Sequence, residues 1–104
     1  MLQQNIINVF IKNEIRNFCH RWKVTELALF GSVLRKDFGP DSDIDVLVSF
    51  ADDACWSLSD LVQMTEDLQS IFIRKVDLVE KKAIRNPFRR QLILSNNEII
   101  YAAS

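Results

Sequence analysis

Two aspartates, Asp43 and Asp45, are separated by one apolar residue at the start of an alternating stretch, Ile44 to Phe50. In a β-strand, residues two apart point to the same face, so we expect both carboxylates to lie side by side. Two carboxylates this close repel each other, and a divalent cation removes that penalty. Hard oxygen ligands favour Mg²⁺ or Mn²⁺, and Mg²⁺ is usually held by a few carboxylates together with substrate phosphates. The pair therefore predicts a metal site that handles phosphates.

A third carboxylate, Asp77, lies in another short apolar stretch, Lys75 to Val79. Neighbouring strands lie about 4.8 Å apart, and paired catalytic metals lie about 3.5–4 Å apart. If the two stretches form adjacent strands, Asp77 completes a three-carboxylate cluster with the first pair. The pattern alone does not give the strand order, so this hypothesis depends on the topology of the sheet.

Gly31 and Ser32 follow the apolar stretch Val24 to Phe30 and begin a turn, with a short helical turn predicted over Val33 to Asp37. Free backbone N–H groups at such a turn bind anions, and a glycine lets a phosphate approach the backbone closely. The Ser32 hydroxyl adds a donor, and Arg35 is placed either to reach the same phosphates or to pair with a carboxylate. Phosphate donors followed by metal carboxylates are what phosphoryl or nucleotidyl transfer requires.

Each of these features alone has an ordinary explanation. A Gly-Ser pair after a strand is often only a turn, and acidic pairs often mark an exposed sheet edge. The segment Asp41 to Asp45 also begins like a calcium-binding EF-hand loop, but Val46 stands at the required glycine and Asp52 at the twelfth position. Only the combination of the features makes the signal specific.

The composition is that of an ordinary globular domain, with 104 residues, 48% hydrophobic, 26% charged, and a net charge of −1. A strongly basic nucleic-acid footprint is absent, no apolar run is long enough to span a bilayer, and the N-terminus lacks a signal peptide. We therefore expect a single domain over residues 1–104, in the cytoplasm, without a membrane or nucleic acid as direct partner. Cys19 and Cys55 lack zinc-site spacing, and we expect reduced, partly buried thiols.

Apolar spacing predicts the elements that position these residues. The predicted helices cover roughly the first twenty residues, Leu58 to Phe72, and Pro87 to about Ser95. The predicted strands are Val24 to Phe30, Ile44 to Phe50, Lys75 to Val79 and Glu98 to Tyr101. Ser57 and Asp60 resemble a capping pair, and Asn86 before Pro87 is a good helix start. The element order predicts an α/β (α+β) fold, with a small mixed β-sheet covered by helices.

Taken together, Gly31-Ser32, Arg35 and Ser42 to Asp45, followed by the acidic strand around Asp77, resemble the minimal nucleotidyltransferase (MNT) family of the DNA polymerase β-like superfamily. The spacing GS-x2-R-x6-SDID is specific, and the resemblance spans nearly the entire chain. The chain departs from the family pattern at Leu34 and Lys36, where small residues are frequent. The resemblance implies the nucleotidyltransferase-like fold.

The resemblance also implies an activity, namely Mg²⁺-dependent transfer of a nucleoside monophosphate from a nucleoside triphosphate such as ATP, with pyrophosphate leaving. By that analogy Asp43 and Asp45 bind two Mg²⁺ ions, while Asp77 binds the catalytic ion and helps deprotonate the acceptor hydroxyl. The implied nucleotide-binding residues are Gly31, Ser32, Arg35 and Ser42.

Free-standing members of the family are typically prokaryotic antitoxins paired with a HEPN-domain ribonuclease toxin. The resemblance therefore implies AMP transfer to a tyrosine of such a toxin. Two alternatives stay open, an antitoxin that acts by binding alone and a nucleotidyltransferase acting on RNA or a small molecule. Superfamily members of the latter kind usually carry a second, acceptor-binding domain, and we expect none here. The oligomeric state stays open between homo- and hetero-oligomers.

A basic segment follows the third predicted strand. It consists of Lys81, Lys82, Arg85, Arg89 and Arg90. A solvated helix face is the first interpretation of such a segment. Contact with an acidic partner, a nucleotide or RNA is the alternative.

Overall fold

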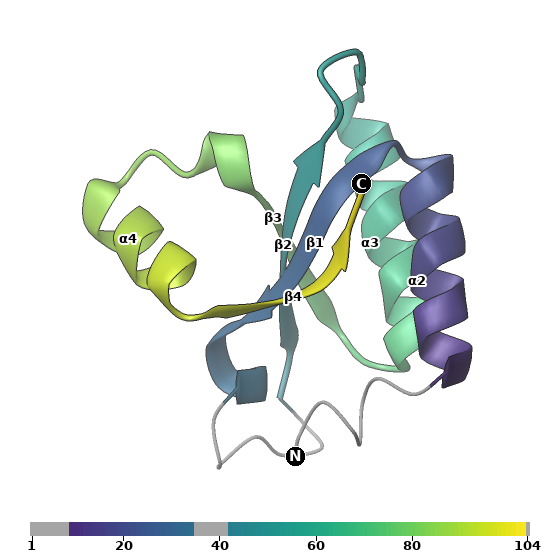
Figure 1. The fold of residues 1–104 in the computed structure, drawn as a ribbon, viewed down its shortest axis with the longest axis horizontal. Helices are drawn as coiled ribbons and strands as arrows, with labels where there is room; N and C mark the ends of the chain where they lie inside the picture. The colour runs from purple at the N-terminus through teal and green to yellow at the C-terminus, as the bar shows by residue number, and fades with distance from the viewer. Residues whose placement is uncertain (1–8, 35–41, 104) are drawn as a thin grey trace.

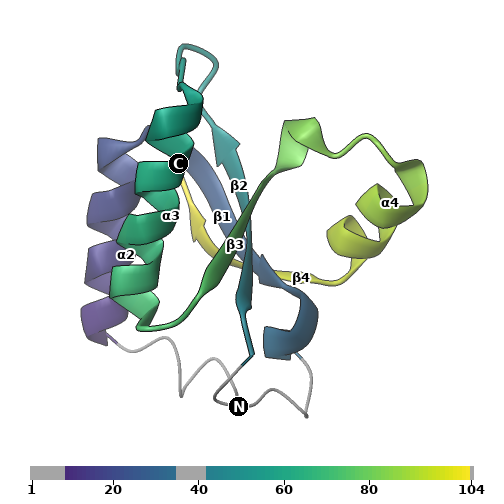
Figure 2. The ribbon, with the colours of Figure 1, turned by 180° about the vertical axis from the view of Figure 1, so that it is seen from behind.

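In the computed structural model, which describes residues 9–34 and 42–103, helices lie on both sides of a four-stranded sheet (Figures 1 and 2). The elements in chain order are α2 (Val9–Arg21), β1 (Val24–Phe30), the 3-10 helix η1 (Gly31–Leu34), β2 (Ile44–Phe50), α3 (Leu58–Phe72), β3 (Val76–Glu80), the 3-10 helix η2 (Lys81–Ala83), α4 (Pro87–Ser95) and β4 (Asn97–Ala102). Helices α2 and α3 lie on one side, and α4 lies on the other. The predicted α/β fold with a small mixed sheet is confirmed.

The strand order in the sheet is β3-β2-β1-β4. Strand β1 runs antiparallel to both β2 and β4, whereas β2 and β3 are parallel. Parallel neighbours need a crossover connection, and α3 provides it. The strand that carries Asp77 is therefore adjacent to the strand that carries Asp45, which is the topology that the three-carboxylate hypothesis requires.

Strand β2 faces a hydrophobic core on each side of the sheet. Ile44, Val46 and Val48 are buried in the larger core with residues of α2 and α3. Leu47 points the other way, into a smaller core. The smaller core also contains Ala28, Phe30, Ile84 and Ile93. The face that carries Asp45 is thus apolar further along the strand, where α4 packs.

Both predicted helix starts are confirmed by their capping hydrogen bonds. The Asp60 N–H donates to Ser57 Oγ at 3.2 Å, and the Ser57 N–H donates to Asp60 Oδ2 at 2.9 Å, which is a complete capping box. At α4 the N–H groups of Phe88 and Arg89 donate to Asn86 Oδ1. These caps satisfy backbone donors that have no partner within the helix.

Several boundaries differ from the sequence-based expectation. The helical turn begins at Gly31 rather than at Val33, because the glycine itself adopts the positive φ of 75° that reverses the chain. Strand β3 runs one residue later than predicted, and the spacing of apolar residues gives no sign of the 3-10 helix η2. The first eight residues, and the end of the helical turn predicted over Val33 to Asp37, lie outside the described residues.

The two cysteines differ in environment. Both are free thiols; Cys19 is buried, and this burial raises its pKa to about 12. The expectation of partial burial is wrong for Cys55, which is exposed because it lies in the connection between β2 and α3 rather than in a packed element. Within residues 9–34 and 42–103, the structure has no helix with the length and apolar character needed to cross a bilayer.

Candidate functional site

The parallel register of β2 and β3 pairs Asp45 directly with Asp77. Paired residues in neighbouring strands share a face of the sheet, so the two carboxylates belong to the same face. On its other side Asp45 pairs with Phe30, the last residue of β1, whose side chain belongs to the smaller core. Asp45 is half-buried and Asp77 is exposed. Two of the predicted carboxylates therefore lie together at the end of the sheet where β1 ends and β2 and β3 begin.

Gly31 lies directly against one member of this pair, Asp45. A β-carbon built on Gly31 would overlap Asp45 Oδ2 and would lie 3.1 Å from Asp45 Cγ. The φ of 75° is also one that side chains rarely adopt. The backbone of the turn therefore touches the side chain of Asp45, whereas the predicted approach of a phosphate to Gly31 stays a prediction.

Ser42 and Asp43 immediately precede β2, and a long-range contact fixes them there. The Arg74 guanidinium donates a hydrogen bond from Nη1 to the Ser42 carbonyl oxygen at 3.3 Å. One residue further, the Ile44 N–H donates to the Lys75 carbonyl oxygen at 2.9 Å. The segment between α3 and β3 therefore holds the start of β2, and with it the position from which Asp43 projects.

The strand that carries Asp77 is held in a similar way. The Val76 N–H donates to Gln69 Oε1 at 3.1 Å, so a side chain of α3 anchors the first residue of β3. Neither Gln69 nor Arg74 was recognised from the sequence. Both act through hydrogen bonds to residues distant in the chain, and apolar spacing gives no sign of such bonds.

The remaining predicted site residues are only partly described. The backbone of Ser32 is part of η1, which begins at Gly31. Arg35 lies outside the described residues, so its predicted role remains a prediction. Asp43 is exposed, while Ser42 is half-buried.

The donor set fits a hard divalent cation through oxygen ligands. Within residues 9–34 and 42–103, no group of three or more His, Cys, Asp and Glu side chains is gathered closely enough to hold a metal ion. Two carboxylates with bound phosphate oxygens suffice for Mg²⁺, which keeps several waters and seldom uses a full protein cage. Asp43 and Asp45 stay the predicted ligands of such a site. The predicted cluster of three carboxylates is not gathered in the described residues, although Asp77 pairs in register with Asp45.

A cavity of about 600 Å³ opens beside Gly31, between η1 and α4. Its lining residues are Phe30, Gly31, Leu34, Arg89, Leu92, Ile93, Asn96 and Asn97. The walls come from the end of β1, from η1, from α4 and from the start of β4. This volume lies within the range of pockets that hold small-molecule ligands.

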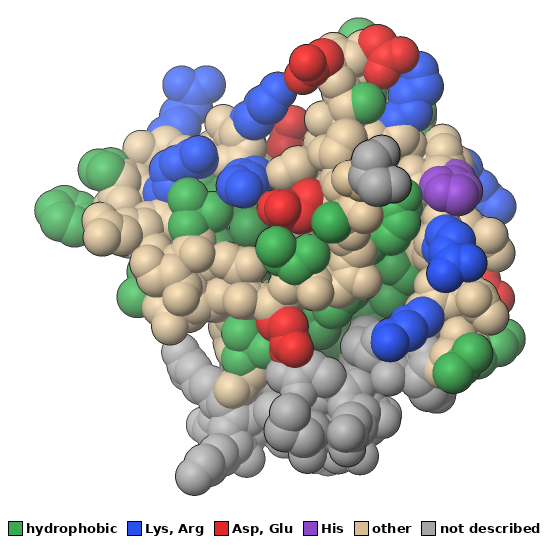
Figure 3. All heavy atoms as spheres, in the orientation of Figure 1, with side chains coloured by type: hydrophobic (Ala, Val, Ile, Leu, Met, Phe, Trp, Pro, Cys, Tyr) green, Lys and Arg blue, Asp and Glu red, His purple; other side chains and the backbone are tan. Residues whose placement is uncertain are grey.

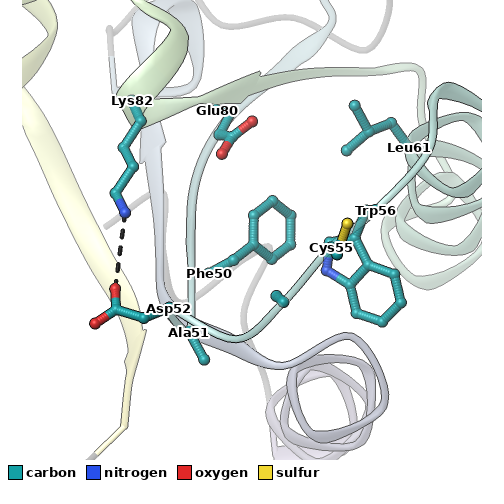
Figure 4. Close-up of a pocket in the computed structure, with 9 residues that line it drawn as sticks. Phe50, Ala51, Asp52, Cys55, Trp56, Leu61, Glu80 and Lys82 are labelled. Carbon is teal, nitrogen blue, oxygen red and sulfur yellow. Dashed lines mark ion pairs between the residues drawn. The ribbon is translucent and has the colours of Figure 1, made fainter.

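A second cavity, of about 300 Å³, lies at the opposite end of β2 (Figure 4). Phe50, Trp56 and Leu61 contribute apolar surface to it, and the Lys82–Asp52 ion pair of 3.8 Å lies at its edge. No predicted site residue lines this cavity. The chemistry predicted from the sequence therefore belongs to the Gly31 end of the sheet.

Lys and Arg side chains gather over η2 and the start of α4 (Figure 3). Part of this basic segment forms contacts that stabilise the fold. Lys81 pairs with Glu26 at 3.3 Å, and Arg90 donates to the Lys81 carbonyl oxygen at 2.8 Å. Arg85 and Arg89 are exposed, and Arg89 lines the cavity beside Gly31. The expectation of a solvated basic face is therefore confirmed for only part of the segment.

Comparisons with known proteins show which family the chain resembles. Residues 11–100 match a family model described as a nucleotidyltransferase domain. The protein adenylyltransferase MntA of Thermococcus cleftensis is 31% identical over 90 residues, which cover 86% of this chain and 83% of that protein. A Methanocaldococcus jannaschii protein named as a candidate protein adenylyltransferase is 38% identical over 81 residues, covering 78% and 79% of the two chains.

Solved structures share the fold. A toxin–antitoxin crystal structure with AMP-PNP superposes with a TM-score of 0.71 at 22% identity, over 89% of this chain and 74% of that chain. A complex of a tri-AMPylated Shewanella oneidensis HEPN toxin with an MNT antitoxin gives a TM-score of 0.65 at 22% identity, over 99% of this chain and 74% of that chain.

Proposed function

Because this chain belongs to the nucleotidyltransferase domain family, we propose that it transfers AMP from ATP to a hydroxyl group of a partner protein. The observation that carries the proposal is the position of Asp45, which is in register with Asp77 on β3 and lies against Gly31. Relatives named as protein adenylyltransferases support the choice of AMP and of a protein acceptor. In this proposal residues 1–104 act as a single catalytic domain.

The triphosphate binds at the turn that follows β1. Its backbone N–H groups and hydroxyl donors suit phosphate oxygens. The proposed nucleotide-binding residues are Gly31, Ser32, Arg35 and Ser42. Asp43 and Asp45 would hold two Mg²⁺ ions together with the phosphates, and Asp77 would contribute to the site of the catalytic ion. When bound, Mg²⁺ neutralises charge on the triphosphate and on the leaving pyrophosphate.

The transfer exchanges one phosphorus–oxygen bond for another. The acceptor oxygen forms a bond to the α-phosphorus, and the bond from that phosphorus to the oxygen bridging the β-phosphate breaks. Pyrophosphate leaves with the electron pair of the broken bond. The proton of the acceptor hydroxyl passes to the carboxylate of Asp77, which lies on the same sheet face as Asp45.

The acceptor in this proposal is a tyrosine of a HEPN-domain toxin, so the chain acts as an antitoxin in a hetero-oligomer. A complex between an MNT antitoxin and a tri-AMPylated HEPN toxin, which shares the fold of this chain, supports this class of partner. AMP-PNP in another complex of the same fold supports an adenine nucleotide as donor.

Label transfer from ATP labelled at the α-phosphate tests the proposal. The acceptor tested is the protein encoded by the adjacent gene, with Mg²⁺ present. We expect label on that protein, and we expect Asp43→Asn and Asp45→Asn each to reduce transfer by about 100-fold or more, because each removes a charged ligand that acts on the transition state. Circular dichroism checks that both variants fold.

Asp52→Asn is the matched control. Asp52 is an exposed aspartate beyond the other end of β2, paired with Lys82, and its substitution is expected to leave transfer unchanged. A stable complex without any label on the partner would support an antitoxin that acts by binding alone. Full activity of Asp45→Asn would remove the metal assignment.

A further inference from the structure

We infer that the nucleoside half of the nucleotide, its ribose and adenine, occupies the cavity of about 600 Å³ between η1 and α4. This inference rests on the proposed function and specifies which part of the protein recognises the nucleotide. It assigns a binding role to α4 and to the start of β4, neither of which carries a residue of the predicted phosphate and metal site.

The cavity adjoins the proposed phosphate site. Gly31 belongs to both, since it lines the cavity and also touches Asp45. A triphosphate bound at the η1 turn therefore has its attached nucleoside within reach of this cavity. The second cavity, at the far end of β2, shares no lining residue with the first.

The walls suit a flat apolar ring. Phe30 and Ile93 are buried residues of the smaller core, and they form the inner part of the lining. Leu34 and Leu92 complete the apolar surface from η1 and α4. Leu92 is 66% exposed, so the outer wall gains apolar contact only when a ligand lies against it. Covering apolar surface of this kind favours binding.

Polar groups at the end of α4 are placed to give selectivity. The side-chain amide nitrogens of Asn96 and Asn97 donate to carbonyl oxygens of α4, which fixes both side chains. Their carboxamide oxygens accept no hydrogen bond from the described residues. Such an oxygen can accept a hydrogen bond from the exocyclic amino group of adenine. The guanidinium of Arg89 supplies further donors, and it forms no ion pair within residues 9–34 and 42–103.

A tyrosine of the partner protein is the rival occupant. The cavity is large for one tyrosine side chain, and it lies within the size range of sites that enclose whole small molecules. Gly31 lines this cavity and also belongs to the proposed triphosphate site, so the cavity adjoins the triphosphate rather than the acceptor. The nucleoside is therefore the occupant that the geometry favours.

Binding measurements on two variants test this assignment. Leu92→Trp adds an indole at the cavity wall, and Arg89→Ala removes the guanidinium; both residues are exposed, so the fold tolerates the changes. The matched controls are Leu58→Trp, at an exposed leucine that begins α3, and Arg85→Ala, at an exposed arginine just before α4. Calorimetric titration of each protein uses Mg-ATP and, separately, magnesium tripolyphosphate.

We expect the two cavity variants to bind Mg-ATP about tenfold more weakly, with tripolyphosphate affinity unchanged and both controls like the unaltered protein. A photoreactive azido-ATP is expected to label residues 87–97.

Unchanged ATP affinity in both cavity variants overturns the inference, and reduced transfer with unchanged ATP affinity assigns the cavity to the acceptor. An unaltered protein that binds neither probe overturns the proposed function as well, whereas normal ATP binding with label elsewhere overturns this inference alone.

Discussion

The structure restricts the identity of residue 31 in two ways. The positive φ of Gly31 disfavours a side chain, and its contact with Asp45 leaves no room for a β-carbon. The contact joins the turn after β1 to β2, because the backbone of Gly31 lies against the side chain of Asp45. A substitution here changes the geometry of both at once.

We predict that Gly31→Ala lowers the free energy of unfolding by at least about 1 kcal/mol, the cost of a β-carbon in the left-handed region. It also displaces the Asp45 carboxylate, so we expect AMP transfer to fall more steeply than stability. Urea denaturation and the label-transfer assay measure the two effects.

A double variant separates the backbone strain at Gly31 from the overlap of a new β-carbon with Asp45. In an Asp45→Ala background the side chain that a β-carbon would meet is gone, while the φ penalty remains. Gly31→Ala should therefore cost less stability in that background. Equal costs in both backgrounds would show that the contact with Asp45 does not constrain position 31.

The residues of the candidate site were predictable to different degrees. Asp43, Asp45 and Gly31 stand out because their types and spacing are unusual within a strand and a turn. Asp77 was predictable only conditionally, since its role depends on β3 pairing with β2. Arg74 was not predictable, because its hydrogen bond to Ser42 joins residues far apart in the chain.

Helix α3 ends in a backbone conformation that its sequence does not favour. Ile73, its C-terminal cap, has φ of 56° and ψ of 43°, the left-handed region in which glycine is usual. Its side chain is 81% exposed, so little packing offsets the cost of a β-branched residue there. The short connection to β3 requires this reversal, because Val76 must reach Gln69.

Ile73→Gly is predicted to raise the free energy of unfolding by about 1 kcal/mol, because glycine adopts the left-handed conformation without the steric penalty. Chemical denaturation gives the value directly. Ile73→Ala is the control, since it shortens the side chain but keeps the β-carbon and should gain much less. A loss of stability in Ile73→Gly would mean that the exposed isoleucine packs in a way the burial of the side chain does not indicate.

Elements with local signals were predicted well. Two helix starts, at Ser57 and at Asn86-Pro87, can be predicted from a few neighbouring residues, because their capping hydrogen bonds join residues two or three apart. The strand order and the parallel pairing of β2 with β3 were not predictable from spacing. They depend on which strands α3 connects and on which faces the helices cover.

At the scale of the whole molecule, the protein has two hydrophobic cores of different size, one on each side of the sheet. The larger core, between the sheet and helices α2 and α3, contains most of the fully buried side chains. The smaller core, beneath α4, lies on the face that carries Asp45 and Asp77. Most of the buried apolar side chains thus lie on one side of the sheet, and the proposed ligand site lies on the other.

We predict that Mg-ATP raises the melting temperature, because a ligand that binds only the native state stabilises it. At a concentration of 100 times Kd the gain is about 2.7 kcal/mol, which for a domain of this size corresponds to a rise of about 10 °C or more. Differential scanning fluorimetry with and without EDTA measures the shift. Asp45→Asn should reduce it, and no shift at millimolar Mg-ATP would count against nucleotide binding.

The register of β2 and β3 also affects when the protein becomes active during its own synthesis. Gly31, Asp45 and Asp77 come from three separate segments, and the parallel pair forms only after the α3 crossover is in place. Pairing between distant segments is a late and slow step of folding. A ribosome-bound chain that ends before β3 therefore lacks the paired carboxylates. The pairing of Asp45 with Asp77 thus requires synthesis through β3, whereas β4, the last strand of the sheet, is synthesised later.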